Sequence, residues 1–128
     1  MEKTDTLKRL LQTNDVILAA GCYDGLSAKL VEKVGFQAAY MTGYGASATV
    51  LGMPDYGFMT MNEMVTHAGN LAMAIQLPLI SDADTGYGNA LNVMRTVLEY
   101  ERAGVSAIHI EDQVFPKRCG HMEGKMVI

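Results

Sequence analysis

Short apolar segments alternate with segments of helical periodicity along the chain, and this alternation limits the folds open to it. The strand candidates are residues 16–20, 38–42, 79–82 and 107–111. Segments with helical spacing of apolar residues precede and separate these strands, at 3–13, about 26–34, from 60 onward and at 90–103. Helical crossovers join parallel strands, so the pattern predicts an α/β fold with about four parallel strands.

Local signals support these elements. Gly35 follows the second helical segment, as a C-terminal glycine does, and Thr60 and Glu63 have the spacing of a capping box. The segment 32–38 resembles 101–107, each being a helix end, a glycine and the start of a strand. One helical stripe contains methionines, and its spacing favours a place in the core over a cofactor surface; it comprises Met61, Met64, Val65, Ala68, Leu71, Ala72 and Ile75.

Length sets the size of the fold. A chain of 128 residues with 49% hydrophobic content is enough for one ordinary domain. A complete eight-stranded barrel of alternating strands and helices needs about 200 residues or more. We therefore expect 1–128 to form a single incomplete domain, the N-terminal half of a (β/α)8 TIM-type barrel, with an open sheet as the alternative.

Composition excludes several classes of function. The formal charge is −4 and the basic residues are scattered, which argues against nucleic acid as a partner. No apolar run reaches the roughly 18 residues that span a bilayer, and Met1 to Asp5 lack a signal-peptide pattern, so we expect no membrane association and a cytoplasmic location. Cys22 and Cys119 are expected to be unpaired thiols.

Two carboxylates, Asp82 and Asp84, stand at the end of the third strand candidate. If the extended conformation continues through both, they point to one side and can share a hard divalent cation. The carboxyl end of a parallel strand is where α/β folds place active sites, which favours this interpretation. The alternative is that one of them caps the turn that follows, because Asp-Thr-Gly is ordinary turn chemistry.

The next strand candidate also ends in an acid. By alternation Glu111 shares a face with His109, while Ile108 and Ile110 face the helices. Glu111 would then join Asp82 and Asp84 at the same edge of the sheet. His109 is a candidate site residue, although a lone inward histidine is more often a hydrogen-bonded core residue.

Cys119 lies in a basic loop. Lys117, Arg118 and His121 flank it, which should favour the thiolate and make the thiol a proton donor or acceptor near neutral pH. Gly120 would let backbone amides approach an anion. The alternative is an incidental loop cysteine. Cys22 has no such neighbours and is expected to be structural.

Five motifs together point to a known family. They are Thr42-Gly-Tyr44, Leu-Gly-Met-Pro-Asp-Tyr-Gly at 51–57, Asp-Ala-Asp-Thr-Gly-Tyr-Gly at 82–88, Ile-Glu-Asp-Gln at 110–113 and Lys-Arg-Cys-Gly-His at 117–121. This combination resembles the isocitrate lyase and phosphoenolpyruvate mutase superfamily. It is most similar to the 2-methylisocitrate lyase branch, whose members are often called carboxyvinyl-carboxyphosphonate phosphorylmutase. The cysteine loop is the most specific of the motifs.

The resemblance implies a Mg²⁺-dependent lyase that cleaves a carbon–carbon bond in a 2-methylisocitrate-like hydroxy-tricarboxylate, giving a 2-oxoacid and succinate. It implies that Asp82 and Asp84 hold the ion, directly or through water, with Glu111 and Asp55 in the wider shell. Cleavage beside an alkoxide leaves negative charge on the departing fragment and a new carbonyl on the other, so a cation can stabilise the oxygens while an acid protonates the carbanion.

The resemblance also implies roles for the remaining positions. The substrate-binding residues would be Thr42, Gly43, Tyr44, Gly120 and Asp55, and the catalytic residues would be Cys119, His121 and Glu111. Cys119 would protonate the enolate-like fragment and His121 would tune its loop. Thr42 stands where many relatives have serine, which keeps the hydroxyl but bears on substrate identity.

Relatives carry further substrate-binding positions in the second half of the barrel, so this chain alone is expected to lack part of its site and to be inactive. Two alternatives stay open: a phosphonomutase or oxaloacetate-acting relative, and a non-catalytic half-barrel that associates through its open sheet edges. The expected partners are a small carboxylate substrate and other copies of the chain in a homo-oligomer.

Overall fold

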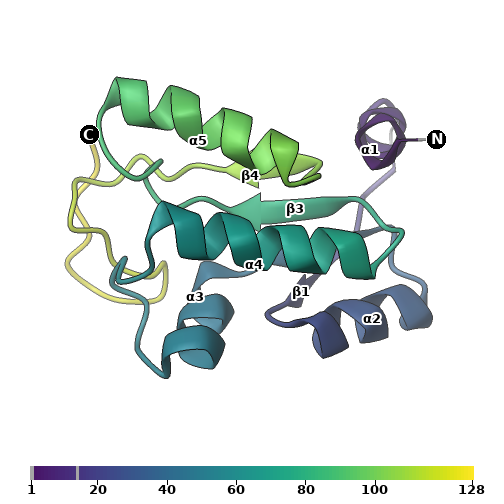
Figure 1. Ribbon diagram of the computed structural model, residues 1–128, viewed down its shortest axis with the longest axis horizontal. Helices are drawn as coiled ribbons and strands as arrows, with labels where there is room; N and C mark the ends of the chain where they lie inside the picture. The colour runs from purple at the N-terminus through teal and green to yellow at the C-terminus, as the bar shows by residue number, and fades with distance from the viewer. Residues whose placement is uncertain (1, 14) are drawn as a thin grey trace.

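The computed structural model describes residues 2–13 and 15–128. Within them a parallel sheet has the strand order β1-β2-β3-β4 (Figure 1). Its strands are β1 (Ala19–Cys22), β2 (Ala38–Met41), β3 (Leu79–Asp82) and β4 (Ala107–His109). The helices are α1 (Lys3–Leu11), α2 (Gly25–Val34), α3 (Gly43–Ala46), the π-helix η1 (Ser47–Leu51), α4 (Met61–Ala74) and α5 (Ala90–Arg102). The predicted α/β fold with about four parallel strands is confirmed.

Strand register separates the two faces of the sheet. Met41 lies opposite Ser81, which lies opposite Ile108, and this row faces helices α2, α4 and α5. The row one residue earlier, Tyr40, Ile80 and Ala107, points to the other side. The apolar core therefore lies between the sheet and its helices.

Helix α4 contributes most of its buried face to that core. The predicted methionine-containing stripe is buried at Met64, Ala68, Leu71 and Ala72, with Ile75 following the helix. Its capping box forms as expected, with the N–H of Glu63 donating to Thr60 Oγ1 and the N–H of Thr60 donating to Glu63 Oε2.

The first strand begins later than the sequence predicts. Residues 16–18 precede β1, with Val16 81% and Leu18 61% exposed. The reason is the register, because Ala19 pairs with Ala38, the first residue of β2. Strand β4 also ends earlier, at His109 instead of residue 111.

No helix was expected between the strand candidate at 38–42 and the helical segment from residue 60 onward, but the segment directly after β2 is helical. Thr42 caps α3 by accepting the N–H of Gly45 at 3.3 Å, and η1 continues directly from it. Gly52, at φ 64°, ends the segment in the left-handed region that favours glycine.

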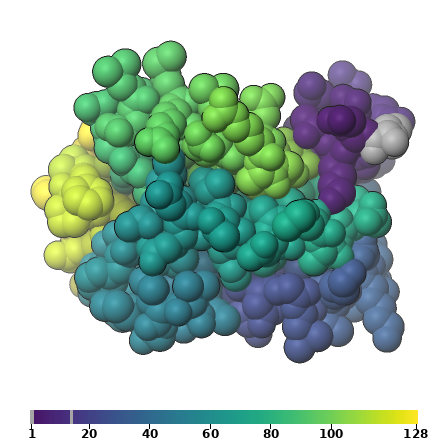
Figure 2. All heavy atoms as spheres, in the orientation of Figure 1, coloured from purple at the N-terminus to yellow at the C-terminus, as the bar shows by residue number. Residues whose placement is uncertain are grey.

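The loops that carry the predicted site lie at one end of the molecule. Figure 1 shows α3 and the C-terminal segment beyond β4 at the end toward which β3 points, with α1 near the opposite end. Figure 2 shows the C-terminal segment packed there against residues of the 40–60 region. Among the described residues, no helix has both the length and the apolarity needed to cross a bilayer.

Candidate active site

Asp82 ends β3 with a buried carboxylate that is 7% exposed. Its Oδ2 accepts the backbone N–H of Gly43 at 3.2 Å, and its Oδ1 accepts the N–H of Asp84 at 3.0 Å. A Cβ atom at position 43 would collide with Oδ2, so glycine is what allows the start of α3 to approach this carboxylate.

Asp84 does not continue the strand. Its φ of 46° lies in the left-handed region, so the predicted alternation that would place Asp82 and Asp84 on one strand face is wrong. The alternative was correct for Asp82, which hydrogen-bonds into the turn. Both carboxylates are nevertheless buried at the carboxyl end of β3, Asp84 being 6% exposed.

Lys117 lies between two of the acids. Its side chain is 1% exposed, and its Nζ is 2.7 Å from Asp55 Oδ1 and 2.6 Å from Asp84 Oδ1. Burial alone would lower the pKa of Lys117, but the bonds to Asp55 and Asp84 outweigh it and raise that pKa above its usual value. Burial raises the pKa of Asp84 to about 6, despite the opposing effect of Lys117. At neutral pH the pair is therefore ionised.

The donor set suits magnesium, since Asp82 and Asp84 offer the carboxylate oxygens that Mg²⁺ prefers and Mg²⁺ keeps several waters. The expected cluster of three acids is not formed. Over residues 2–13 and 15–128, no three His, Cys, Asp or Glu side chains are grouped so as to hold a metal ion. Glu111 lies beyond the end of β4, where its N–H donates to the Asp84 carbonyl at 2.8 Å and its carboxylate accepts from Gln113.

The Cys119 loop is attached to the same acids. The N–H of Cys119 donates to the Asp55 carbonyl at 3.1 Å, and its Sγ lies 3.2 Å from His121 Nδ1. Burial raises the pKa of Cys119 and outweighs His121 and Lys117, which both lower it, so the basic neighbours act in the predicted direction without producing a thiolate. Lys117 is paired with Asp55 and Asp84, and Arg118 donates to the Glu123 carbonyl. The thiol is therefore protonated at neutral pH.

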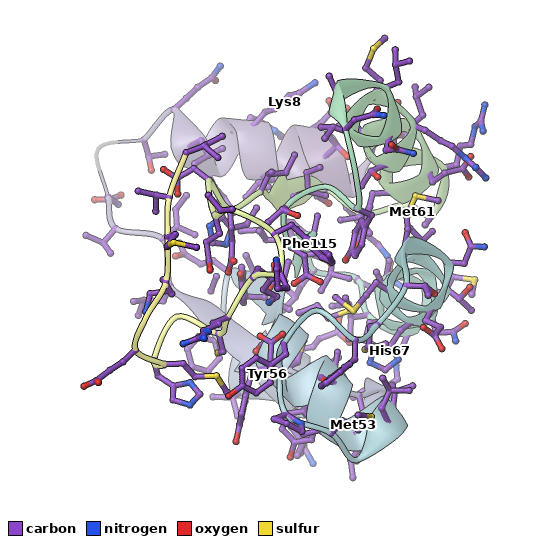
Figure 3. The ribbon with its side chains drawn as sticks, turned by 90° about the vertical axis from the view of Figure 1, so that its left-hand side faces the viewer. Lys8, Met53, Tyr56, Met61, His67 and Phe115 are labelled. Atoms are coloured by element: carbon purple, nitrogen blue, oxygen red, sulfur yellow. The ribbon has the colours of Figure 1, made fainter. Side chains whose placement is uncertain are left out.

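The expected substrate-binding residues border this loop. Tyr44 and His121 meet edge to face with ring centroids 5.6 Å apart. The Gly120 carbonyl accepts from Lys125 Nζ at 2.7 Å. The view onto this end in Figure 3 shows Phe115 near its centre and Tyr56, from the loop before α4, below it. The loops after β2, β3 and β4 therefore meet at one end of the sheet.

Sequence reasoning missed two contacts. The sequence predicts Lys117 only as a basic neighbour of Cys119, and not its ion pairs with Asp55 and Asp84. The several acidic motifs in the sequence are the signal that could have indicated a buried counter-ion. Tyr40 OH lies 3.0 Å from His109 Nδ1 on the sheet face away from the helices. His109 is hydrogen-bonded, as expected for a core histidine, but it is exposed and therefore not part of the core.

Both cysteines are free, as expected. Cys22 is fully buried at the end of β1, and burial, assisted by Asp24, raises its pKa to about 11. A thiol in this state is inert near neutral pH, which agrees with the structural role predicted for it.

Comparison with known proteins places this geometry in context. Residues 7–126 match the family described as phosphoenolpyruvate phosphomutase. The chain is 52% identical to 2,3-dimethylmalate lyase of Eubacterium barkeri, over 100% of this chain and 44% of that protein. It is 45% identical to 2-methylisocitrate lyase of Aeropyrum pernix, over 95% of this chain and 39% of that protein.

Solved structures agree with the sequence matches. Oxaloacetate acetylhydrolase in complex with the inhibitor 3,3-difluorooxalacetate superposes with a TM-score of 0.95 at 43% identity, covering 99% of this chain and 44% of that one. Phosphonopyruvate hydrolase in complex with oxalate and Mg²⁺ gives 0.87 at 35% identity, covering 97% and 44%. The chain thus spans less than half the length of the proteins it matches.

Proposed function

This chain belongs to the phosphoenolpyruvate phosphomutase family, and from that premise we propose that it forms the cation-binding and proton-donating part of a carbon–carbon bond lyase. Members of the superfamily are TIM barrels, and the four parallel strands are the N-terminal half of such a barrel. The proposed substrate is a 2-methylisocitrate-like hydroxy-tricarboxylate, cleaved to a 2-oxoacid and succinate.

One observation carries the proposal. Two buried carboxylates, Asp82 and Asp84, lie at the carboxyl end of β3, and the loop that bears a protonated thiol is bonded to the same group of acids. A magnesium ion held by Asp82 and Asp84 would supply positive charge for the oxygens of the substrate. The Mg²⁺ in the phosphonopyruvate hydrolase structure supports this choice of ion.

The proposed cleavage balances without a redox partner. The substrate hydroxyl gives its proton to a water molecule and becomes a carbonyl as the adjacent carbon–carbon bond breaks. The electron pair of that bond passes to the departing fragment as an enolate, which takes the proton of Cys119. The thiolate then regains a proton from solvent through His121, whose Nδ1 lies 3.2 Å from Sγ. The raised pKa of Cys119 keeps the thiol protonated, so the proton is present when the enolate forms.

The contacts around the acids support the other roles. The N–H of Gly43 orients the Asp82 carboxylate. Tyr44, which is 51% exposed, packs its ring against His121 of the cysteine loop. We propose that Thr42, Gly43, Tyr44 and Gly120 bind the substrate carboxylates, with Asp55 and Glu111 in the wider shell of the ion.

The test is release of a 2-oxoacid from 2-methylisocitrate, with and without Mg²⁺, by the protein that carries these 128 residues. Cys119→Ser should lower turnover by about 10²- to 10⁴-fold, the usual contribution of a general acid, while leaving cation binding intact. Asp84→Asn should lower both turnover and Mg²⁺ affinity. Cys22→Ser is the matched control and should retain activity. Unchanged turnover in Cys119→Ser would contradict the proposal.

A second activity is favoured by the TM-score of 0.95 to oxaloacetate acetylhydrolase. A structure of that enzyme contains the product oxalate. The same protein should therefore be given oxaloacetate and assayed for oxalate. If oxalate forms from oxaloacetate and no 2-oxoacid is released from 2-methylisocitrate, the proposed activity is that of the hydrolase and not of the lyase.

A further inference from the structure

The turn that follows Asp82 and carries Asp84 has a strained backbone. Asp84 and Tyr87 both have positive φ, at 46° and 63°, a conformation that residues other than glycine rarely adopt. Gly86, at φ 86°, lies in the same turn. Such a conformation costs free energy and persists only where the surrounding contacts determine it. The contacts that determine this turn therefore bear on where the two carboxylates lie.

Helix α5 supplies two of these contacts. The Tyr100 hydroxyl donates to the Asp82 carbonyl at 3.1 Å, and the Thr96 hydroxyl donates to the Gly86 carbonyl at 2.9 Å. Met61 Sδ, 3.3 Å from the Thr96 hydroxyl, is a weaker acceptor than that carbonyl. The two donors are four residues apart, so they lie on one face of the helix, which packs beside α4 (Figure 1). That face is bonded to both ends of the segment 82–86.

Both donors are buried, Thr96 being 0% and Tyr100 1% exposed. The Tyr87 hydroxyl lies 3.2 Å from that of Tyr100, and Tyr87 is the donor there because the one hydroxyl proton of Tyr100 goes to Asp82. Burial raises the pKa of both tyrosines, that of Tyr100 to about 12, so both hydroxyls are protonated at neutral pH. A Cβ atom at Gly86 would come within 2.6 Å of Val93 Cγ2, so the turn lies directly against α5.

We propose that Thr96 and Tyr100 are positioning residues that hold the segment 82–88 in the conformation that presents Asp82 and Asp84 to the cation. The binding of a cation there rests on the proposed function, whereas the attachment of the turn to α5 does not. Both hydroxyls act through backbone carbonyls. Removing either one therefore leaves the two carboxylates in the protein but releases the backbone that orients them.

Thr96→Val and Tyr100→Phe each remove a hydroxyl at nearly unchanged shape. With Mn²⁺ as a spin probe, we expect each variant to bind the ion about tenfold or more weakly, because outer-shell partners of metal ligands typically contribute about 10- to 100-fold in affinity. Electron paramagnetic resonance of unbound Mn²⁺ measures this without substrate or turnover, in the protein that carries these 128 residues. Thr96→Ser keeps the hydroxyl and should bind Mn²⁺ nearly as tightly as the wild type.

Leu71→Ala is the control for a purely structural role. It removes a core side chain that is 1% exposed and cannot hydrogen-bond to the turn, so it should lower stability and leave Mn²⁺ affinity unchanged. If the two hydroxyls only stabilised the fold, Thr96→Val and Tyr100→Phe would behave in the same way. That result, or a Thr96→Ser variant that binds Mn²⁺ as weakly as Thr96→Val, would overturn the positioning role.

Hydrogen exchange followed by mass spectrometry tests the attachment without a cation. In the wild type the amides of Ala83 and Gly86, which donate to the carbonyls of His109 and Ala83, should exchange about as slowly as those of α5. In Thr96→Val and Tyr100→Phe, exchange within 83–88 should accelerate by a larger factor than exchange within β1. Fast exchange of this segment in the wild type, as in an open loop, would overturn the attachment even if neither variant folds.

The proposed function can fail separately. If the wild type binds no Mn²⁺, the cation site is wrong and its positioning falls with it, but the exchange rates still decide whether α5 holds the turn. If the Mn²⁺ affinities follow the expected order and no 2-oxoacid is released, the positioning role stands and the proposed reaction is wrong.

Discussion

The helix-covered face of the sheet and its carboxyl end are both buried, but by different kinds of group. On the helix side the buried side chains are apolar, for example Met41, Leu71 and Leu79. At the carboxyl end they include Asp82, Asp84 and Lys117. Apolar burial stabilises in proportion to area and tolerates adjustment, whereas buried charges depend on particular partners at particular distances. The first region should therefore govern stability and the second should govern chemistry.

The two cysteines give the largest expected contrast between these regions. Cys22 is fully buried on the core side, and Cys119 is partly exposed at the carboxyl end. Iodoacetamide should alkylate Cys119 faster by at least about a thousandfold, because Cys22 reacts only when the core opens. Since burial raises the pKa of Cys119, its alkylation rate should still be rising at pH 9. Mass spectrometry of timed samples measures both rates, and comparable rates would mean that the two regions open together.

A core truncation on α4 should have the next largest effect. Leu71 is 1% exposed, and Leu71→Ala should lower the free energy of unfolding by about 2–5 kcal/mol through lost burial and a residual cavity. Met73, two residues along the same helix, is 75% exposed, so Met73→Ala should change stability by about 0.5 kcal/mol or less. Urea unfolding followed by circular dichroism measures both. A similar loss in the two variants would contradict the placement of the core.

The same division explains what the sequence could predict. Helix α4 and strand β3 were found nearly to the residue, because the capping box at Thr60 and the apolar periodicity are local signals. Helix α3 was missed because Gly43 and Gly45 disfavour helix, and tertiary contacts decide there: Gly43 approaches Asp82, and Gly45 approaches Tyr23.

At the carboxyl end the sequence identified acids and a cysteine, but not how they are joined. The turn at Asp84 depends on a positive φ that strand alternation cannot anticipate. The burial of Lys117 depends on Asp55, which is distant in sequence, and the raised pKa of Cys119 depends first on burial of its thiol in the folded chain. Ion pairs between separate loops leave no periodic trace, which is why the residues were identified but their partners were not.

Gly43→Ala tests whether the site at the carboxyl end of the sheet can be perturbed while the apolar core stays intact. The added Cβ would collide with the far end of the Asp82 side chain, which can rotate away. We expect Mn²⁺ affinity to fall by about tenfold. The free energy of unfolding should fall by about 0.5–2 kcal/mol, because a hydrogen bond to a carboxylate contributes about 1.5–3 kcal/mol and alanine regains about 1 kcal/mol over glycine in a helix. Gly21→Ala on β1 is the control, since a Cβ there meets nothing within 4 Å. If Gly43→Ala destabilised the fold as much as Leu71→Ala, the carboxyl end would be part of the core.

The smallest expected effect concerns the loop between the two regions, which leads from the acids into α5. Asn89 caps that helix by accepting the N–H groups of Leu91 and Asn92 at 2.9 and 3.3 Å. Asn89→Ala should lower the free energy of unfolding by about 1 kcal/mol, and Asn89→Ser, which keeps a capping oxygen, by less. Mn²⁺ affinity should stay unchanged in both, because the turn that bears Asp84 is held by Thr96 and Tyr100 and not by the cap. A drop in Mn²⁺ affinity in Asn89→Ala that Asn89→Ser restores would mean that the helix cap, and not these two hydroxyl groups, positions the acids.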